Sequence, residues 1–196
     1  MRARKQRRTR DLIVATAFTL FAEHGFAKVS VDEVAERAEV GRTTFFRYFA
    51  DKQDVVFSDE QRMAGMVVAL QRETDIPAAS DLRGALGQVR DVTLQLTAAA
   101  AADPFHWAIH IRLLRDNPEL YERDLRHLQR YASLTEDLLI ARGAPADIAV
   151  LAAQLGLACY FAGRLRAGTE AKVLVPAVQD AFDQLGFASL ELKRLV

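Results

Sequence analysis

The segment GRTTFFRYF, residues 41–49, places four aromatic side chains among two arginines and two threonines. On a helix, Phe45 and Phe49 share one face, because side chains four residues apart are neighbours. Arg42 and Arg47 then fall toward the other side with the threonines. The segment is therefore predicted to be a short helix with an apolar face that anchors it and a cationic face that can meet an anionic partner.

A second short helix is predicted just before this segment. Ser30 and Glu33 have the spacing of a capping box, which satisfies amide donors at a helix start. Two short helices with a tight turn, the second carrying arginines, form a helix-turn-helix, whose second helix can enter the major groove of DNA. An ordinary amphipathic helix with solvated arginines is the alternative. The basic segment, capping box and short turn together favour the DNA-binding geometry.

The charge of the chain is concentrated at its beginning. The formal net charge of the 196 residues is zero, but residues 1–50 hold ten Lys and Arg against six Asp and Glu. Six of those ten lie before Asp11, a composition typical of a flexible, solvated basic arm. The first helix is then expected from about Thr9 to His24, where Gly25 ends it.

A basic start followed by LIVATAFTLF resembles a signal peptide in outline. Asp11 at the junction argues against this alternative. So does the helical spacing of Ile13, Ala17 and Leu20, which is typical of a core-facing stripe. The lone cysteine, Cys159, cannot form an internal disulfide, as expected in a reducing compartment. We therefore expect a cytoplasmic protein.

The rest of the chain repeats one kind of periodicity. Apolar residues recur at steps of three and four, and no segment alternates as a strand does. This predicts an all-α protein of about nine helices, with a helix-turn-helix domain and basic arm over residues 1–50 and a second helical domain over residues 51–196. The later helices are expected to start near Asp51 (running to about Arg72), Leu82, Asp103, Asn117, Pro145 and Val175.

Residues 9–55 resemble the DNA-binding domain of the TetR (tetracycline repressor) family of bacterial transcription regulators. The small residue Ala38, Val40, the TxFRYF core and Lys52 all fall in register with it. The resemblance implies a homodimeric regulator of transcription, most simply a repressor that a small-molecule effector releases from operator DNA. A DNA-binding architectural factor without an effector is the alternative.

The same resemblance implies which side chains touch DNA. Base or phosphate contacts are expected from Arg42, Thr43, Arg47 and Tyr48, and further phosphate contacts from Thr44, Lys52, and Ser30 or Val31 at the start of the second helix. Two positions depart from the family pattern. Phe46 replaces a usual tyrosine and removes a phosphate-binding hydroxyl. Glu39 replaces a usual turn glycine and is expected to adopt a left-handed conformation at a cost of roughly 1 kcal/mol.

The helix after Pro145 is apolar on nearly every side, so it must be covered on nearly every side. A membrane span is the alternative, but the run is short of the ~20 residues required, and no membrane partner is expected. Small residues would let a helix of a second subunit approach closely, and the resemblance implies that the last two helices form the dimer interface. The candidates are Ala149, Ala153, Gly156, Gly163, Ala181 and Leu185.

The resemblance also implies an effector pocket in the helices between these regions. Its candidate residues are His106, Trp107, His110, Tyr121, Cys159 and Tyr160. His106 and His110 could also pair on a metal, but no third ligand is evident nearby, so neither metal nor cofactor is expected. No nucleophile, base and orienting acid occur together, which argues against an enzyme. Arg123, Arg126 and Arg130 are expected to form a solvated face.

Overall fold

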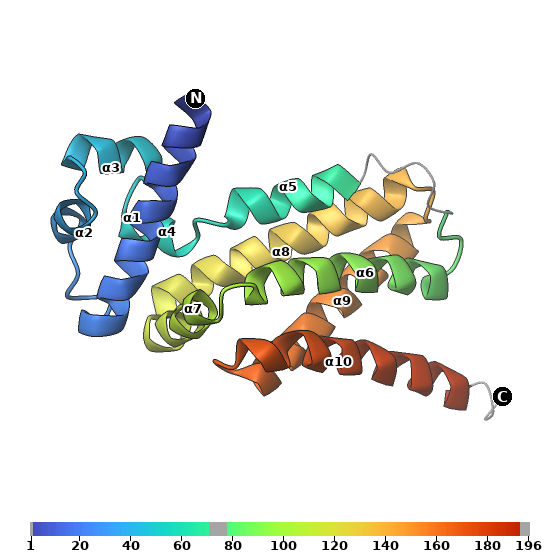
Figure 1. The fold of residues 1–196 in the computed structure, drawn as a ribbon. Coiled ribbons are helices and arrows are strands. Elements are labelled where there is room, and N and C mark those ends of the chain that lie inside the picture. The colour runs from blue at the N-terminus through green and yellow to red at the C-terminus, as the bar shows by residue number, and fades with distance from the viewer. Residues whose placement is uncertain (1, 71–77, 193–196) are drawn as a thin grey trace.

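The computed structural model describes residues 2–70 and 78–192, and within these ranges its regular structure is entirely helical (Figure 1), which confirms the all-α prediction. Ten helices are described, one more than expected. They are α1 (Arg2–His24), α2 (Val31–Arg37), α3 (Arg42–Tyr48), α4 (Lys52–Val56), α5 (Glu60–Leu70), α6 (Leu82–Ala101), α7 (Pro104–Asp116), α8 (Pro118–Ala141), α9 (Ala146–Ala167) and α10 (Ala171–Leu192).

The chain folds around two main cores. Helices α1 to α4 form a head at one end of the molecule, and α5 to α10 form a larger helical body beside it (Figure 1). The apolar core of the head continues into the body, since Ile109, Leu113 and Leu114 of α7 and Leu120 of α8 belong to it. Head and body are therefore joined by a packed junction rather than by a tether alone.

Several helix boundaries follow the local sequence. The Ser30 hydroxyl accepts a hydrogen bond from the Glu33 amide at 3.1 Å, as the capping box predicts. The Asp103 carboxylate likewise accepts from the His106 amide at 3.0 Å and caps α7. Asn117 precedes α8 as expected, but its side-chain amide donates to a carbonyl in α7 at 2.8 Å instead of capping α8.

The basic segment is helical, so the prediction of a flexible arm is wrong. Helix α1 extends back to Arg2, and residues 4–8 are exposed along it. Arg, Lys and Gln are good helix formers, and no glycine or proline interrupts residues 2–24. The positive charge of the basic segment is therefore carried on the first turns of α1, which extend from the head toward the N-terminus (Figure 1).

The single helix expected after Asp51 is two helices, α4 and α5. The chain turns at residues 57–59, where an Arg10 guanidinium nitrogen of α1 donates to the Ser58 carbonyl oxygen. This tertiary contact competes with a continuous helix. The predicted end near Arg72 lies outside the described residues. The last helix begins at Ala171 rather than Val175, and Pro176 lies inside its second turn.

Helix α9 passes through the middle of the body and packs against α6, α8 and α10. Among the described helices it alone is long and apolar enough to cross a membrane by length and composition, and one third of its most apolar stretch is buried inside the protein. The same features suit a core helix with one uncovered face.

The small residues of α9 permit close packing within one chain. Ala149, Ala153, Gly156 and Gly163 are buried in the protomer. A β-carbon on Gly163 would lie 2.7 Å from the backbone nitrogen of Val178 in α10. We expected these residues to face a second subunit, but all four are buried within one protomer, where Gly156 faces Val89 of α6 and Gly163 faces Val178 of α10. Ala181 and Leu185 are half-buried and pack against the same core.

Candidate nucleic-acid interface and ligand cavity

Helix α3 is anchored by its aromatic residues. Phe45 is fully buried and Phe49 is 3% exposed, which confirms the predicted inner face. The turn before α3 contains Glu39 at φ 53°, the left-handed conformation expected there. Phe46 is 44% exposed and lies under the Arg42 guanidinium, 5.5 Å from ring centroid to Cζ. The outer face of α3 is therefore both cationic and aromatic.

The expected DNA-contacting residues lie on the outer side of the head. Arg42, Thr43, Arg47 and Ser30 are exposed, and Thr44, Tyr48 and Val31 are half-buried. Arg42 is already paired: its guanidinium lies 2.6 Å from the Asp32 carboxylate of α2. The Arg47 guanidinium lies 5.2 Å from the Tyr48 ring centroid. Thus Arg47 and Thr43 are presented outward, whereas one guanidinium nitrogen of Arg42 is engaged by Asp32.

Lys52 has a structural role in the head. Its ammonium donates to the carbonyl oxygens of Phe26 at 2.8 Å and Val29 at 3.0 Å, and it lies 4.5 Å from the Phe26 ring centroid. These bonds tie the start of α4 to the loop between α1 and α2. The phosphate contact expected of Lys52 would compete with them and remains a prediction.

A cavity of about 360 Å³ lies between the head and the body. Helices α1 and α4 to α9 all contribute to its wall, so it touches the head directly. His106, Trp107, His110 and Tyr160 line it, as expected. Tyr121 is instead 42% exposed outside it, and Cys159 is buried in the core of the body. Burial raises the pKa of the Cys159 thiol to about 11, which disfavours the reactive thiolate.

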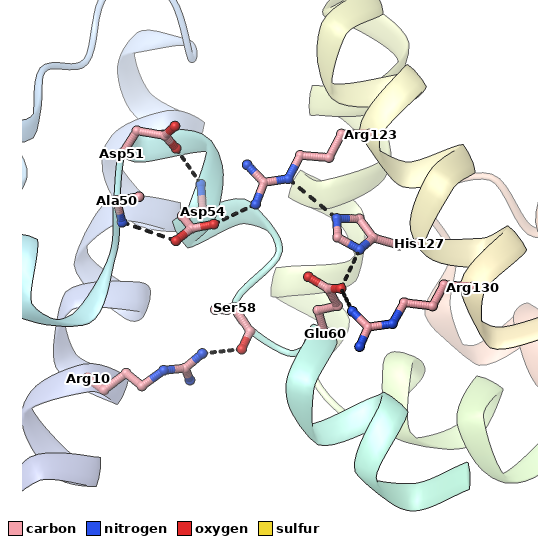
Figure 2. Close-up of polar contacts among 9 residues, drawn as sticks. All are labelled: Arg10, Ala50, Asp51, Asp54, Ser58, Glu60, Arg123, His127 and Arg130. Carbon is pink, nitrogen blue, oxygen red and sulfur yellow. Dashed lines mark hydrogen bonds and ion pairs between the residues drawn. The ribbon is translucent and has the colours of Figure 1, made fainter. Parts of the chain in front are cut away.

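Polar contacts join the head to the body, and α5 to α8 within the body, beside the cavity (Figure 2). Arg123 of α8 donates to the Asp54 carboxylate of α4 at 2.5 Å. The Glu60 carboxylate at the start of α5 lies 2.9 Å from His127 Nδ1 and 2.9 Å from Arg130 Nη1. The expectation of a solvated face is therefore wrong for Arg123, which is 22% exposed, whereas Arg130 pairs with Glu60 but remains 62% exposed. Arg126 is exposed as expected.

The Asp54 carboxyl is adapted to this contact. Partial burial alone would raise its pKa, but the Ala50 amide, the Arg123 hydrogen bond and charge, and the Arg10 charge together lower the pKa. Asp54 is therefore held as a carboxylate at the point where α4 meets α8. The head is connected to the body by charge at this point as well as by apolar packing.

A second ion pair is buried at the cavity wall. Asp124 of α8 accepts from Arg164 of α9 at 2.5 Å, and the two side chains are 9% and 10% exposed. His110 Nε2 lies 3.8 Å from the other Asp124 oxygen. Burial would raise the pKa of Asp124, but hydrogen bonding from His110 and the Arg164 charge lower the pKa. Asp124 thus remains charged beside an apolar cavity.

Sequence reasoning missed several polar residues of the wall. Asp124 carried a usable signal, because it lies four residues from both Leu120 and Leu128 in the apolar stripe of α8. Glu60 and His127 carried none, since their pairing joins segments 67 positions apart in the chain. Among the described residues no group of three or more His, Cys, Asp or Glu is gathered as metal ligands.

The fold and the outward face of α3 define a helix-turn-helix regulator of transcription. The family model for bacterial regulatory proteins of the tetR family matches residues 13–58. The HTH-type transcriptional regulator TcmR of Streptomyces glaucescens is 31% identical over 199 residues, which span 94% of this chain and 86% of TcmR. The chain therefore belongs to the tetR family and is a DNA-binding transcriptional regulator, not an enzyme.

Solved structures show the same fold. The regulator FadR of Bacillus subtilis, in complex with stearoyl-CoA, superposes with a TM-score of 0.60 at 20% identity, over 89% of this chain and 96% of FadR. The SmeT–triclosan complex superposes with a TM-score of 0.61 at 15% identity, over 90% of each chain. At identities this low, the similarity shows a shared fold, and the ligand of each complex is a property of that protein.

Proposed function

We propose that the protein is a cytoplasmic, homodimeric repressor that binds operator DNA through two copies of α3 and is released when a small molecule occupies the cavity. The observation that carries this proposal is that residues of the cavity wall also make the contacts between head and body. Phe18 of α1 packs against His106 of α7, with 4.2 Å between the ring centroids, and Arg10 of α1 donates to the Ser58 carbonyl in the turn that leads to α5. All four residues line the cavity. A molecule in the cavity therefore contacts both the head and the body. It can bind one arrangement of the two more tightly than another, as ligand control requires.

The uncovered face of α9 supports the dimer. Val150 and Leu151 are 41% and 48% exposed, and Leu165 is 87% exposed. Together with half-buried Phe161 they recur at helical spacing along one side of α9. Gln154 interrupts the stripe, but exposed apolar residues grouped on one face of a helix are typical of a protein–protein surface. This stripe, rather than the buried small residues, is our proposed contact with a second copy of the chain.

Two copies of α3 give the selectivity that one short helix lacks. In helix-turn-helix dimers the two reading helices enter successive major grooves about 34 Å apart. The proposed operator is therefore a two-fold symmetric site with half-sites one helical turn apart. Two relatives in fold are solved with a small molecule, triclosan in one and stearoyl-CoA in the other. These complexes support an effector role for the cavity over an architectural factor without a ligand.

The test is selection of bound fragments from a random DNA pool, followed by affinity measurement on the selected site. A symmetric site bound by a dimer is the expected result. Arg47→Ala should lose about 1 to 3 kcal/mol of specific binding and relax the preference for that site. Arg126→Ala, which removes an exposed arginine of α8, is the matched control. Equal binding of selected and random DNA by the parent protein would refute the proposal.

A further inference from the structure

The polar groups of the cavity wall are unevenly divided between donors and acceptors. Four carboxylates line it, against one guanidinium and three imidazoles among the described residues. The carboxylates belong to Asp11, Asp59, Glu60 and Asp124, and the guanidinium to Arg10. Three of these carboxylates are paired with arginines, Asp59 with Arg62, Glu60 with Arg130 and Asp124 with Arg164. None of those three arginines belongs to the lining that the described residues form, so the wall presents the acidic partner.

Many donors in the wall already face protein acceptors. The imidazoles of His106, His110 and His127 lie beside the carboxylates of Asp103, Asp124 and Glu60. Trp107 Nε1 donates to the Gly168 carbonyl at 3.0 Å, and an Arg10 guanidinium nitrogen donates to the Ser58 carbonyl. The hydroxyls of Thr97 and Thr135 donate to backbone carbonyls one helical turn earlier, at 2.6 and 2.9 Å. A hydroxyl that has donated keeps its oxygen lone pairs. The two threonine hydroxyls therefore keep acceptor capacity for a ligand, and the Trp107 N–H has no donor capacity left.

The negative charges act on one region of the cavity. Burial first, and then the charges of Glu60 and Asp124, raise the pKa of the Tyr131 hydroxyl, which also lines the cavity. The two carboxylates are thus both close enough to influence one side chain. Glu60 and Asp124 are 20% and 9% exposed, so water screens them weakly. An anion placed here would be repelled, and a cation would be attracted.

The rest of the wall suits an apolar body. Val14, Met63, Val89, Leu96 and Leu128 contribute aliphatic surface, and Phe18, Phe57 and Trp107 contribute aromatic rings. Aromatic faces attract a cation within about 6 Å of the ring centroid. The apolar wall excludes a small hydrated ion such as a metal, and the acidic wall disfavours a fatty acid or another anionic lipid.

From this chemistry we infer that the effector site takes a lipophilic amine. Such a ligand is an apolar molecule with a protonated, hydrogen-bond-donating ammonium group, which lies between Glu60 and Asp124. This inference rests on the proposed effector role of the cavity and gives its ligand class. The ammonium group of the ligand competes with His127 and Arg130 for the Glu60 carboxylate. Because that carboxylate ties the start of α5 to α8 beside the head, its capture links ligand binding to the position of the DNA-binding domain.

The test uses three probes that share a ten-carbon chain and differ only in their polar end group. They are decylamine, decanol and decanoate, each as dispersed monomer near pH 7. The only tryptophan of the chain, Trp107, lines the cavity and reports binding by its fluorescence. Decylammonium should bind at least ten-fold more tightly than decanoate, with decanol between them. Glu60→Gln should weaken decylammonium at least three-fold and leave decanol unchanged, and Asp124→Asn should do the same if it folds.

Asp137→Asn, which removes an exposed carboxylate of α8 outside the cavity, is the matched control and should leave all three affinities unchanged. Decanoate binding as tightly as decylammonium would overturn the inference and leave the effector role of the cavity intact. An equal effect of Glu60→Gln on all three probes would also overturn it. If no probe changes Trp107 fluorescence, both the amine inference and the effector role of the cavity fail.

Discussion

The Arg123 guanidinium of α8 donates a hydrogen bond to the Asp54 carboxylate of α4, 69 positions earlier in the chain. The Cζ atom of the same arginine lies 5.0 Å from the Phe57 ring centroid. Figure 2 shows the contact with Asp54 of α4, and through Phe57 the same arginine also contacts the turn that follows α4. Arg123 therefore connects the DNA-binding head to the body at this point. It also adjoins the cavity, since Phe57 lines it.

A double-mutant cycle with Arg123→Gln and Asp54→Asn should give a coupling of roughly 0.5–1 kcal/mol at neutral pH, because Asp54 is 35% exposed and solvent screens the pair. The folded pKa of Asp54 is lowered, so its stabilisation is present above the ordinary Asp pKa and is lost as pH falls through the folded pKa below about 4. Urea unfolding of the four proteins at neutral and acid pH measures this. A coupling that persists in strong acid would contradict an ionic contact.

The exposed pair Arg42–Asp32 should restrain DNA binding. Asp32→Ala frees the Arg42 guanidinium and removes a negative charge beside α3. Affinity for random duplex should rise, and the magnitude of the salt slope should increase by about 0.9 if Arg42 then neutralises one more phosphate. Binding at several salt concentrations measures both quantities. Weaker binding would mean instead that Asp32 positions Arg42 for contact, and Asp137→Asn controls for a change of net charge alone.

Lys52→Met separates a structural role from a phosphate contact. The variant loses the bonds of the ammonium to the Phe26 and Val29 carbonyls, and the free energy of unfolding should fall by about 1–3 kcal/mol. The salt slope of DNA binding should stay unchanged. Lys28→Met, in the exposed loop between α1 and α2, is the matched control and should leave stability unchanged. A stable variant with a shallower salt slope would favour the phosphate contact.

Local chemistry made part of this structure predictable. Phe45 and Phe49 were assigned to the core from their spacing, the Ser30 cap from its partner at Glu33, and the left-handed turn from Glu39. Each of these features depends on residues a few positions apart. The turn between α4 and α5 was missed, because the bond from Arg10 to Ser58 that accompanies it joins positions 48 residues apart.

The candidate sites show the same division. Small residues in α9 correctly indicated a close helix–helix approach, but the pattern does not say whether the approaching helix belongs to the same chain. His106, Trp107 and His110 were assigned to the pocket that the family resemblance implies, and all three line it. The Glu60 and Asp124 carboxylates of the same wall come from α5 and α8, and only the folded chain brings these helices together with α7.

Gly163→Ala should destabilise the protein by about 3 kcal/mol or more, because the new β-carbon would lie 2.8 Å from the Val178 Cα, a backbone atom that cannot rotate away. Gly65→Ala is the matched control within a helix. Its β-carbon meets nothing within 4 Å, so the gain in helix propensity should stabilise the protein by about 0.5–1 kcal/mol. Thermal and urea unfolding measure both. A tolerated Gly163→Ala would contradict the close approach of α9 and α10.

Leu165→Asp tests the surface proposed for self-association. Leu165 is 87% exposed, so the substitution disturbs no packing inside the protomer and should leave the helical signal and unfolding of an isolated chain unchanged. A charge placed within an apolar contact must be desolvated without a partner, so the dimer should dissociate. Sedimentation should show a monomer, and affinity for a two-fold symmetric operator should fall, because each half-site is then bound independently. Leu12→Asp places the same charge on exposed α1, 49% exposed, and should sediment as the parent does. If Leu165→Asp remains a dimer, the subunits associate through another face, and the exposed stripe of α9 requires a different partner.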